Sequence, residues 1–331
     1  MTSNWILKQL EVKNAFLHGD LKEQVYMEQP LDFKDVSYPT HVCRLNKALY
    51  GLKQALRAWF EKLKCSLHHR GFINSVADSS LFILKNSKVH VLFLMYVDDI
   101  IISGSNFSFI EKLIKGSNSE FSLKDLGALH YFLGIEVHCY STGFILSQAK
   151  YIRNLLTETR MTQAKSVPTP MRIGNQLSAH EGDLLTNLEE YRSIVGALQY
   201  LTITRPEITF SVNKLCQFVH SPITSHWNAC KRLLRYLNGT IHYGLHFKVP
   251  DMNKIVFHAF TDSDWASCPD DRRSCSGYCV FLGPNVISWS ARKQHVVARS
   301  STEAEYRALA NVNGANQRVA TGFATTYCVV R

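Results

Sequence analysis

The sequence lacks the features that would place this chain in a membrane or outside the cell. It has no run of about 20 apolar residues, the length that a membrane-spanning helix needs. Its first residues, MTSNWILKQL, lack the basic and then apolar pattern of a secretory signal peptide. The nine cysteines are an odd number with no C-x-x-C pair, which favours reduced core thiols over a disulfide framework. Together these absences favour an intracellular protein without a membrane partner.

Negative charge is also scarce. The 331 residues include 37 Lys and Arg against 27 Asp and Glu, which leaves a formal net charge of +10. That excess favours a polyanionic partner, with nucleic acid ahead of a membrane surface. The 14 histidines are scattered and predict no zinc site. With 46% hydrophobic residues the chain has ample material for packed cores, which excludes a disordered protein.

The length predicts two or three compact domains. Residues 1–140 mix strand-like and helical patterns, residues 141–250 look mainly helical, and residues 251–310 combine short strands with a following helix. Polar linkers near 162–190 and near 248–254 are the candidate boundaries.

Apolar residues at helical spacing predict three particular helices, over 52–67, 191–201 and 227–237. The first pattern stops at Gly71, and the second is ended by Pro206, which cannot continue a helix. Each apolar stripe is most simply the face that a helix turns toward the core.

Two adjacent aspartates interrupt an apolar stretch typical of buried β-structure, LFLMYVDDIIISG at 92–104. Burying unpartnered carboxylates is costly, and Asp98 and Asp99 also repel each other. A structural hydrogen-bond knot or a hairpin tip is the plain explanation. A divalent metal site is the alternative, because hard cations take carboxylate oxygens and two such ions can clamp a nucleotidyl transfer.

Several blocks of sequence together resemble one family, the Pol polyprotein of copia-type retrotransposons, which contains a reverse transcriptase followed by a ribonuclease H. The similar blocks run in order from about residue 5 to 310, and they are YVDD (96–99), QLEVKNAFLHGDLKEQVYMEQP (9–30), CRLNKALYGLKQALRAWFEKL (43–63), FSLKDLGALHYFLGIEV (121–137), YRSIVGALQYLTITRPEITFSVN (191–213), HWNACKRLLRYLNGT (226–240) and the segments AFTDSDWASCPDDRRSCSGYCVFLG and ISWSARKQHVVARSSTEAEYRALA within 259–310.

The resemblance implies an α+β fold: a right-hand polymerase palm and thumb, with the fingers largely missing, followed by a partial ribonuclease H-like α/β domain. We expect the palm over 1–140, the thumb and connection over 141–250, and the truncated ribonuclease H-like domain over 251–331. The chain begins at the first catalytic strand, and the tail 311–331 has no Asp or Glu and does not resemble the family. We therefore expect a protein truncated at both ends.

By the same resemblance, Glu11, Asp98 and Asp99 are the catalytic carboxylates that hold two Mg²⁺ ions, with Mn²⁺ as the alternative ion. The family has Asp where this chain has Glu11, whose extra methylene moves the carboxylate outward by about 1 Å. Leu56 stands where the family usually has Pro, which should loosen the turn before the following helix.

Four residues match the nucleotide-binding positions of the family: Phe16, Gly51, Gln54 and Tyr96. The ring of Phe16 matches the aromatic side chain that leaves no room for a 2′-hydroxyl, although an arbitrary Phe is usually a core residue. Gly51 lies in the nucleotide-facing turn, where a missing side chain lets a ligand approach the backbone.

In the ribonuclease H-like segment, Asp262 and Glu305 match catalytic and metal-binding carboxylates. Glu305 also completes a T-x-x-E pattern with Thr302, so capping the helix is an equally good explanation of it. Asp264 matches no catalytic position. The family needs a further aspartate that this chain lacks, so we expect weak metal binding and poor cleavage.

The resemblance implies an RNA template, a DNA primer, an RNA–DNA hybrid and deoxynucleoside triphosphates as partners. Lys231, Arg232 and Arg235 are candidate contacts to nucleic acid, although a solvated helix face explains them equally well. The resemblance implies an RNA-directed DNA polymerase, and the oligomeric state stays open. Because of the missing fingers and of Glu11, we expect weak activity or an inactive fragment that binds nucleic acid non-specifically.

Overall fold

The computed structural model describes residues 5–172, 174, 177–180, 182–249 and 256–330. The chain divides into two compact units, which we call the N-terminal unit (residues 3–129, with 322–331) and the C-terminal unit (residues 130–321). The expected domain limits at 140 and 250 stay predictions, and residues 250–255, which include most of the second expected linker, lie outside the described residues.

The N-terminal unit is built on a six-stranded antiparallel sheet with the strand order β4-β5-β6-β7-β1-β8. Its strands are β1 (Ile6–Val12), β4 (Ile73–Asn74), β5 (Leu81–Lys85), β6 (His90–Tyr96), β7 (Asp99–Gly104) and β8 (Leu123–Ala128). The helices are α1 (Ala55–His69) and α2 (Phe107–Phe121), with short 3₁₀ turns η1 (Ala15–His18) and η2 (Leu31–Phe33).

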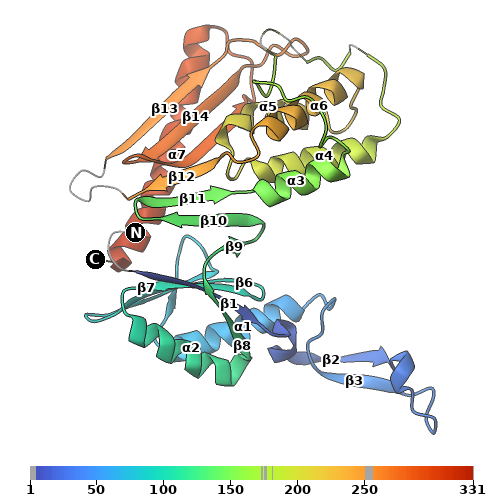
Figure 1. The fold of residues 1–331 in the computed structure, drawn as a ribbon, viewed down its shortest axis with the longest axis vertical. Coiled ribbons are helices and arrows are strands. Elements are labelled where there is room, and N and C mark those ends of the chain that lie inside the picture. The colour runs from blue at the N-terminus through green and yellow to red at the C-terminus, as the bar shows by residue number, and fades with distance from the viewer. Residues whose placement is uncertain (1–4, 173, 175–176, 181, 250–255, 331) are drawn as a thin grey trace. The chain divides into compact units, whose positions relative to one another are not determined.

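Both helices cover the same face of this sheet (Figure 1). Alternate strand residues such as Leu10 and Ile100 are fully buried and form the core together with Trp59 and Leu63 of α1 and Ile110 of α2. Because side chains alternate along a strand, the residues between them lie on the other face of the sheet. That second face carries Glu11 and Asp99.

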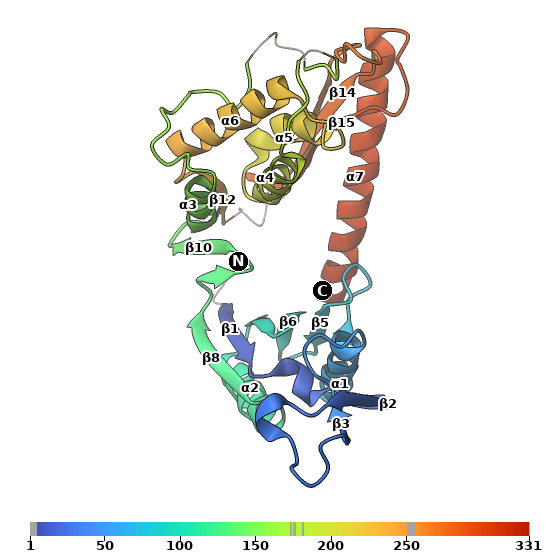
Figure 2. The same cartoon turned by 90° about the vertical axis from the view of Figure 1, so that its right-hand side faces the viewer.

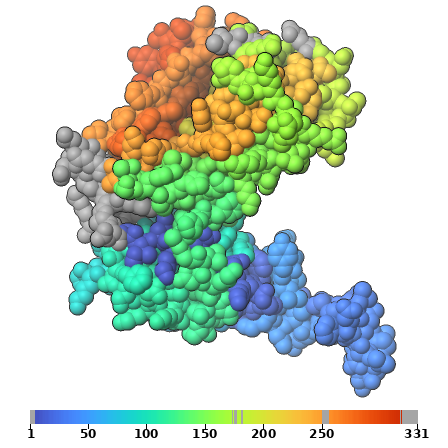
Figure 3. Space-filling model, in the orientation of Figure 1, coloured from blue at the N-terminus to red at the C-terminus, as the bar shows by residue number. Residues whose placement is uncertain are grey.

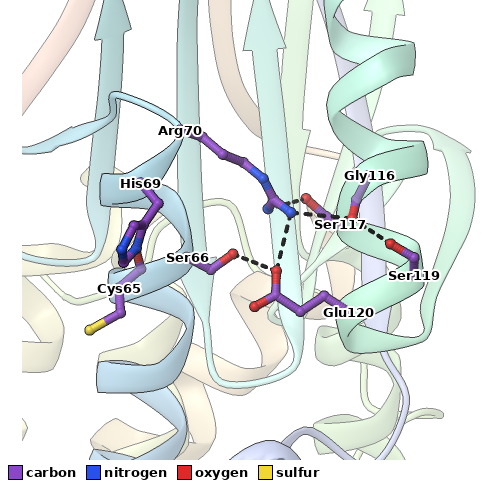
Figure 4. A network of polar contacts seen from close by, with 8 residues as sticks. All are labelled: Cys65, Ser66, His69, Arg70, Gly116, Ser117, Ser119 and Glu120. Atoms are coloured by element: carbon purple, nitrogen blue, oxygen red, sulfur yellow. Dashed lines mark hydrogen bonds and ion pairs between the residues drawn. The ribbon is translucent and has the colours of Figure 1, made fainter.

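Polar contacts join the ends of α1 and α2 beside this core (Figure 4). The guanidinium of Arg70 donates to Ser117 Oγ at 2.9 Å and to Glu120 Oε2 at 3.1 Å. Ser66 Oγ donates to the same carboxylate at 2.7 Å. The network fixes the two helices relative to each other, and therefore also the sheet that they support.

A two-stranded ribbon of β2 (Asp20–Glu28) and β3 (Val42–Lys47) stands out from the rest of the N-terminal unit (Figure 3). At its base Asp20 pairs with Lys47 and Lys62. Hydrogen bonds from these two lysines lower the pKa of Asp20 to about 2. The ribbon leads into the turn at Gly51 that precedes α1.

The C-terminal unit contains two further antiparallel sheets, with the strand orders β12-β11-β10-β9 and β13-β14-β15. Its strands are β9 (Tyr131–Phe132), β10 (Ile135–Tyr140), β11 (Gly143–Ser147), β12 (Gly244–Lys248), β13 (Phe257–Ser263), β14 (Cys275–Leu282) and β15 (Asn285–Lys293). Its helices are α3 (Ala149–Glu158), α4 (Leu188–Leu201), α5 (Thr209–Cys216), α6 (Thr224–Gly239) and α7 (Ser301–Val330) up to residue 321, with the 3₁₀ turn η3 (Pro206–Ile208).

The three helices predicted from apolar spacing are confirmed as α1, α4 and α6. The expectation that residues 141–250 are mainly helical misses β11 and β12 at the two ends of that range. These strands pair with each other across about a hundred residues of chain, a long-range contact that a local pattern does not reveal. None of the helices in the described residues combines the length and the hydropathy of a membrane-spanning segment.

The expected polar linker around 162–190 contains no helix or strand in its described part before α4 begins at Leu188, and α6 holds it in place. Arg235 Nε donates to Lys165 O at 2.6 Å, and Asn238 Nδ2 donates to Ala164 O at 2.9 Å. The polar side of α6 therefore faces a packed segment of chain in addition to solvent.

Candidate functional site

The two adjacent aspartates lie at the tip of a hairpin. β6 and β7 are joined by Val97 and Asp98, and Tyr96 pairs with Asp99 across the hairpin. Val97 has a φ of 56°, a left-handed conformation that is a genuine outlier for a β-branched residue. Such strain costs about 1–3 kcal/mol and persists only where the surroundings enforce it. The sequence-based hairpin tip is therefore correct, and the turn is a strained one.

A buried tryptophan holds this turn. Trp59 of α1 is fully buried, and its Nε1–H donates to the carbonyl oxygen of Val97 at 2.7 Å. The sequence predicted Trp59 only as part of a helical core stripe. Its hydrogen bond to the turn was not predictable, because it joins residues that are 38 positions apart.

The strand register brings Glu11 to the hairpin. In the antiparallel pair of β1 and β7, Glu11 lies directly opposite Asp99, and Val12 N–H donates to Asp98 O at 2.8 Å. Side chains directly opposite each other on one face of a sheet have Cβ atoms about 5 Å apart. The structure thus places Glu11 opposite Asp99, and Asp98 precedes Asp99 in the hairpin turn.

The electrostatics of Asp99 reflect this proximity. Burial raises the pKa of the Asp99 carboxyl, and the negative charges of Asp98 and Glu11 raise it further. A hydrogen bond from Gln9 opposes the shift by favouring the charged form. Gln9 is itself buried, and it lies two residues before Glu11 on the same face of β1. We missed Gln9 in the sequence, although its position two residues from an expected catalytic carboxylate was a usable signal.

Glu11 has a second neighbour on the other side of β1. Lys124 of β8 is its partner in the register, and Lys124 Nζ lies 3.6 Å from Glu11 Oε2. The two side chains are 56% and 43% exposed, so solvent screens this pair and it adds little stability. The pair does, however, turn the carboxylate of Glu11 toward β8.

Glu11, Asp98 and Asp99 fit a metal site that substrate and water would complete. They do not form a site in which protein side chains alone surround the ion. In the described part of the chain, no three His, Cys, Asp or Glu side chains form a group ready to hold a metal ion. Mg²⁺ is usually bound through one or two carboxylates, with waters and substrate phosphates completing its coordination. Asp98 and Asp99 supply two adjacent carboxylates of that kind, and Glu11 lies opposite the second.

The candidate nucleotide-binding residues all lie in the N-terminal unit. Phe16 is in η1, directly after β1, and its ring centroid is 5.6 Å from that of exposed Tyr50. Phe16 also packs against the core, so the core explanation holds for part of its surface. Gly51 has a φ of 91° with open space where a side chain would be, and half-exposed Tyr96 precedes the hairpin turn. Gln54 immediately precedes α1.

The second pair of carboxylates is in the C-terminal unit. Asp262 is on β13 and Glu305 is on α7, and both are exposed. One contact relates them, because the backbone N–H of Ser263 donates to Glu305 Oε1 at 3.3 Å. Asp264 accepts the Cys275 N–H at 2.6 Å, which gives it a structural role.

The capping explanation of Glu305 is wrong. α7 begins at Ser301, and Ser300 caps it by accepting the Glu303 N–H at 3.1 Å. Thr302 therefore lies inside the first turn. The capping pattern is displaced by two residues, and Glu303, not Glu305, reaches back to accept the Arg299 N–H at 2.8 Å.

The basic side chains of α6 already contact other residues of the chain. Arg232 donates to Thr169 Oγ1 at 2.7 Å, Arg235 donates to the linker carbonyl of Lys165, and Lys231 lies over the ring of Trp227. They line a hollow of about 530 Å³ together with Arg172. The cluster thus binds the linker and still presents positive charge at the surface.

Comparison with known proteins finds a reverse transcriptase family model and Pol polyproteins of retrotransposons. The family model described as reverse transcriptase (RNA-dependent DNA polymerase) matches residues 1–173. The Pol polyprotein of transposon RE1 from Arabidopsis thaliana is 50% identical over 314 residues, which are 95% of this chain and 21% of that protein. The Pol polyprotein of transposon TNT 1-94 from Nicotiana tabacum is 38% identical over 312 residues, which are 91% of this chain and 23% of that protein.

A shorter relative is matched over nearly all of its length. A putative transposon Ty5-1 protein from Saccharomyces cerevisiae is 30% identical over 300 residues, which are 90% of this chain and 97% of that protein. By contrast, the chain spans about a fifth of the length of the plant Pol polyproteins that it matches.

Proposed function

The chain belongs to the reverse transcriptase family of copia-type retrotransposon Pol polyproteins, and on that premise we propose that it is an RNA-directed DNA polymerase with Glu11, Asp98 and Asp99 as its catalytic carboxylates. The observation that carries the proposal is the register of β1 against β7, which sets Glu11 opposite Asp99 beside the strained hairpin turn. The mixed α and β structure fits a reverse transcriptase domain.

In this proposal, the 3′-hydroxyl of a DNA primer attacks the α-phosphorus of a deoxynucleoside triphosphate, and pyrophosphate leaves. A pair of Mg²⁺ ions, when bound, would activate the hydroxyl and stabilise both the attacking and the leaving oxygens. Asp98 and Asp99 would hold the ions from the hairpin tip, and Glu11 would contribute from β1. Gln9 favours the ionised form of Asp99 that metal binding requires.

The incoming nucleotide is bound by the segments around this hairpin. Phe16 limits the space beside the sugar, so that deoxyribose fits better than ribose. Gly51 lets the nucleotide approach the backbone in the turn before α1, where an added Cβ would have open space around it. Gln54 and Tyr96 provide polar contacts on either side.

Glu11 is the reason to expect a slow enzyme. Its longer side chain carries the carboxylate away from the position of an aspartate, and Lys124 lies on that outer side. Misplacing a catalytic group by about 1 Å costs about 100-fold in rate. We therefore propose a weak polymerase.

Primer extension on poly(rA) with an oligo(dT) primer tests the proposal, with Mg²⁺ and Mn²⁺ in parallel. We expect slow extension that is abolished by Asp98→Asn. Asp32→Asn is the matched control, because Asp32 is an exposed aspartate of η2 on the same unit. Extension that survives Asp98→Asn would overturn the proposed site. Salt-dependent template binding without any extension would leave a non-catalytic nucleic-acid binder instead.

We further propose that the N-terminal unit corresponds to the palm, the helices of the C-terminal unit to the thumb and connection, and β13 to α7 to a ribonuclease H remnant. Asp262 and Glu305 would hold a metal ion only weakly, because a single long hydrogen bond relates the segments that carry them. Lys231, Arg232 and Arg235 of α6 would contact the phosphates of the template, the primer or their RNA–DNA hybrid. A filter-binding assay tests that contact, since a triple alanine variant should bind more weakly and with a shallower salt dependence.

A further inference from the structure

A polar cavity lies between the β14–β15 face of the second sheet and helix α7, which runs alongside these strands (Figure 2). Its volume is about 640 Å³. All the residues that line it belong to the C-terminal unit, so it is distinct from the carboxylates of the N-terminal unit. The side chains used below are Ser276, Tyr278, Ser290, Arg292, Gln294 and Arg307.

Small and polar side chains predominate among the described residues that line the cavity, and Val296 is the one large aliphatic residue among them. On the sheet, Ser276 pairs with Arg292 and Tyr278 pairs with Ser290, so the face is polar on both strands at these positions. On the helix, the buried residues at this point include Ala308 and Ala315. Protein interiors are normally close-packed, and a helix on a sheet normally meets it through large apolar side chains. Small and polar residues on both walls indicate a binding site rather than a core.

Gln294 provides the second, independent observation. The side chain is 7% exposed and lines the cavity. Its Nε2 donates to Ser276 Oγ at 2.7 Å and to Ala304 O at 3.0 Å, and the second partner fixes the amide orientation because a carbonyl only accepts. Its Oε1 is buried and has no hydrogen-bond partner in the described part of the chain. A buried acceptor without a partner is costly, so a ligand with a hydroxyl or amine donor would relieve it.

The charge of the lining indicates the rest of the ligand. The described lining residues include three cations and no Asp or Glu. Lys293 is neutralised by Asp271 at 2.8 Å and Arg307 by Glu303 at 2.7 Å, both from outside the cavity. Arg292 has no ion pair among the described residues. A guanidinium presents a planar fork of donors that matches the oxygens of a phosphate.

We propose that this cavity binds a phosphorylated ribose, the unit that a nucleoside monophosphate and an RNA strand share. The phosphate contacts Arg292, and a sugar hydroxyl donates to Gln294 Oε1. The volume lies within the range of about 300–1,000 Å³ typical of small-ligand pockets. The site is independent of the proposed polymerase activity, because none of its residues belongs to the carboxylate site.

Calorimetric titration of the full chain with UMP, inorganic phosphate and a short oligo(U) tests the proposal. We expect UMP to bind, and Arg292→Ala to weaken its binding by about tenfold or more, as expected for loss of a charged hydrogen bond. Ser290→Leu should abolish binding by filling the cavity. Arg153→Ala, which removes an exposed arginine of α3, is the matched control and should change nothing. Circular dichroism establishes that each variant is folded.

The three probes separate the parts of the inference. Inorganic phosphate should bind at least about tenfold more weakly than UMP, because it leaves Gln294 without a sugar hydroxyl. Equal affinity for the two would overturn the role of Gln294. Tighter binding of oligo(U) than of UMP identifies a strand as the source of the nucleotide, and the reverse identifies a free nucleotide. No binding of UMP at millimolar concentration, or equal binding by Arg292→Ala, would overturn the proposal. Primer extension should be unchanged in Arg292→Ala, so the two proposals fail separately.

Discussion

The two units of the molecule each carry acidic residues that the sequence pointed to, and they hold them differently. In the N-terminal unit, two neighbouring strands set Glu11 directly opposite Asp99 and next to Asp98. In the C-terminal unit, Asp262 and Glu305 are on a strand and a helix, related through one backbone hydrogen bond of 3.3 Å. A strand register repeats along many hydrogen bonds, so it places side chains far more rigidly than a single contact does.

The pKa of Asp99 shows the consequence. Burial and the charges of Asp98 and Glu11 all raise it, which means that the fold keeps three carboxylates close together at a cost. A cation would relieve that repulsion. The comparison therefore teaches that the N-terminal unit holds Glu11 and Asp99 opposite each other, as the proposed nucleotidyl transfer requires. Four changes test this difference, beginning with the one from which we expect the largest effect.

Removing a carboxylate from each unit gives the largest contrast. Asp99→Asn keeps the shape of the side chain but removes a negative ligand, so primer extension should fall by more than about 100-fold. Asp262→Asn should leave extension unchanged, because it lies in the other unit. Single-nucleotide incorporation measures both rates. A loss of extension in Asp262→Asn would show that the two units do not act separately.

Shortening the side chain of Glu11 should have the opposite effect on primer extension and increase its rate. Glu11→Asp draws the carboxylate back toward the hairpin and away from Lys124, so extension should increase by up to about 100-fold. Glu11→Gln is the control, since it keeps the length of the side chain and removes the charge. If Glu11→Asp is no faster than the wild-type chain, something other than the length of this side chain limits the rate.

A substitution at Gly104 of β7 tests the register of β7 against its neighbours. Gly104 pairs with both Val91 of β6 and Ile6 of β1. A Cβ at Gly104 would lie 2.6 Å from His90 O, so Gly104→Ala should destabilise the N-terminal unit by about 1–3 kcal/mol. Gly277→Ala in β14 is the matched control, because its Cβ would meet Ser290 O at an ordinary 3.7 Å. Urea unfolding measures both, and similar losses would show that close backbone approach at Gly104 is unimportant.

The smallest expected effect is on the pKa of Asp99. Glu11→Gln removes a negative neighbour and so favours the charged form, which lowers the pKa of Asp99; burial, the largest cause, still holds it above the ordinary value. Because the folded pKa is raised, Asp99 contributes stability at pH values below its ordinary pKa and loses it as the pH rises through the raised value. NMR titration of the Asp99 carboxyl measures the shift. An unchanged pKa in Glu11→Gln would show that the two carboxylates do not interact.

Several particular features were predictable from the sequence because they are local. Apolar spacing predicted α1, α4 and α6, although α4 ends at Leu201, before the Pro206 that was expected to end it and that instead begins η3. The apolar flanks of Asp98 and Asp99 predicted two strands and a turn. In each case the signal spans no more than about four turns of helix or one hairpin, which is the range over which backbone periodicity is informative.

Other features were not predictable because distant segments create them. The hydrogen bond from Trp59 to Val97, the attachment of the linker to Arg235 and the pairing of β11 with β12 each join residues far apart in the chain. The sequence placed the cap of α7 at Thr302, two residues after its actual position at Ser300. Serine and threonine patterns overlap there, and only the backbone conformation decides between them.

The sequence by itself determined which chemical groups this protein has: the acidic residues 11, 98 and 99, the basic helix 224–239 and the polar strands around 276–292. The tertiary structure alone decided which of these groups meet. Antiparallel register set Glu11 opposite Asp99, and small residues on both walls left a cavity beside Gln294. The physical reason is that periodicity orients a side chain on its own element, whereas proximity between elements depends on the packing of the whole chain.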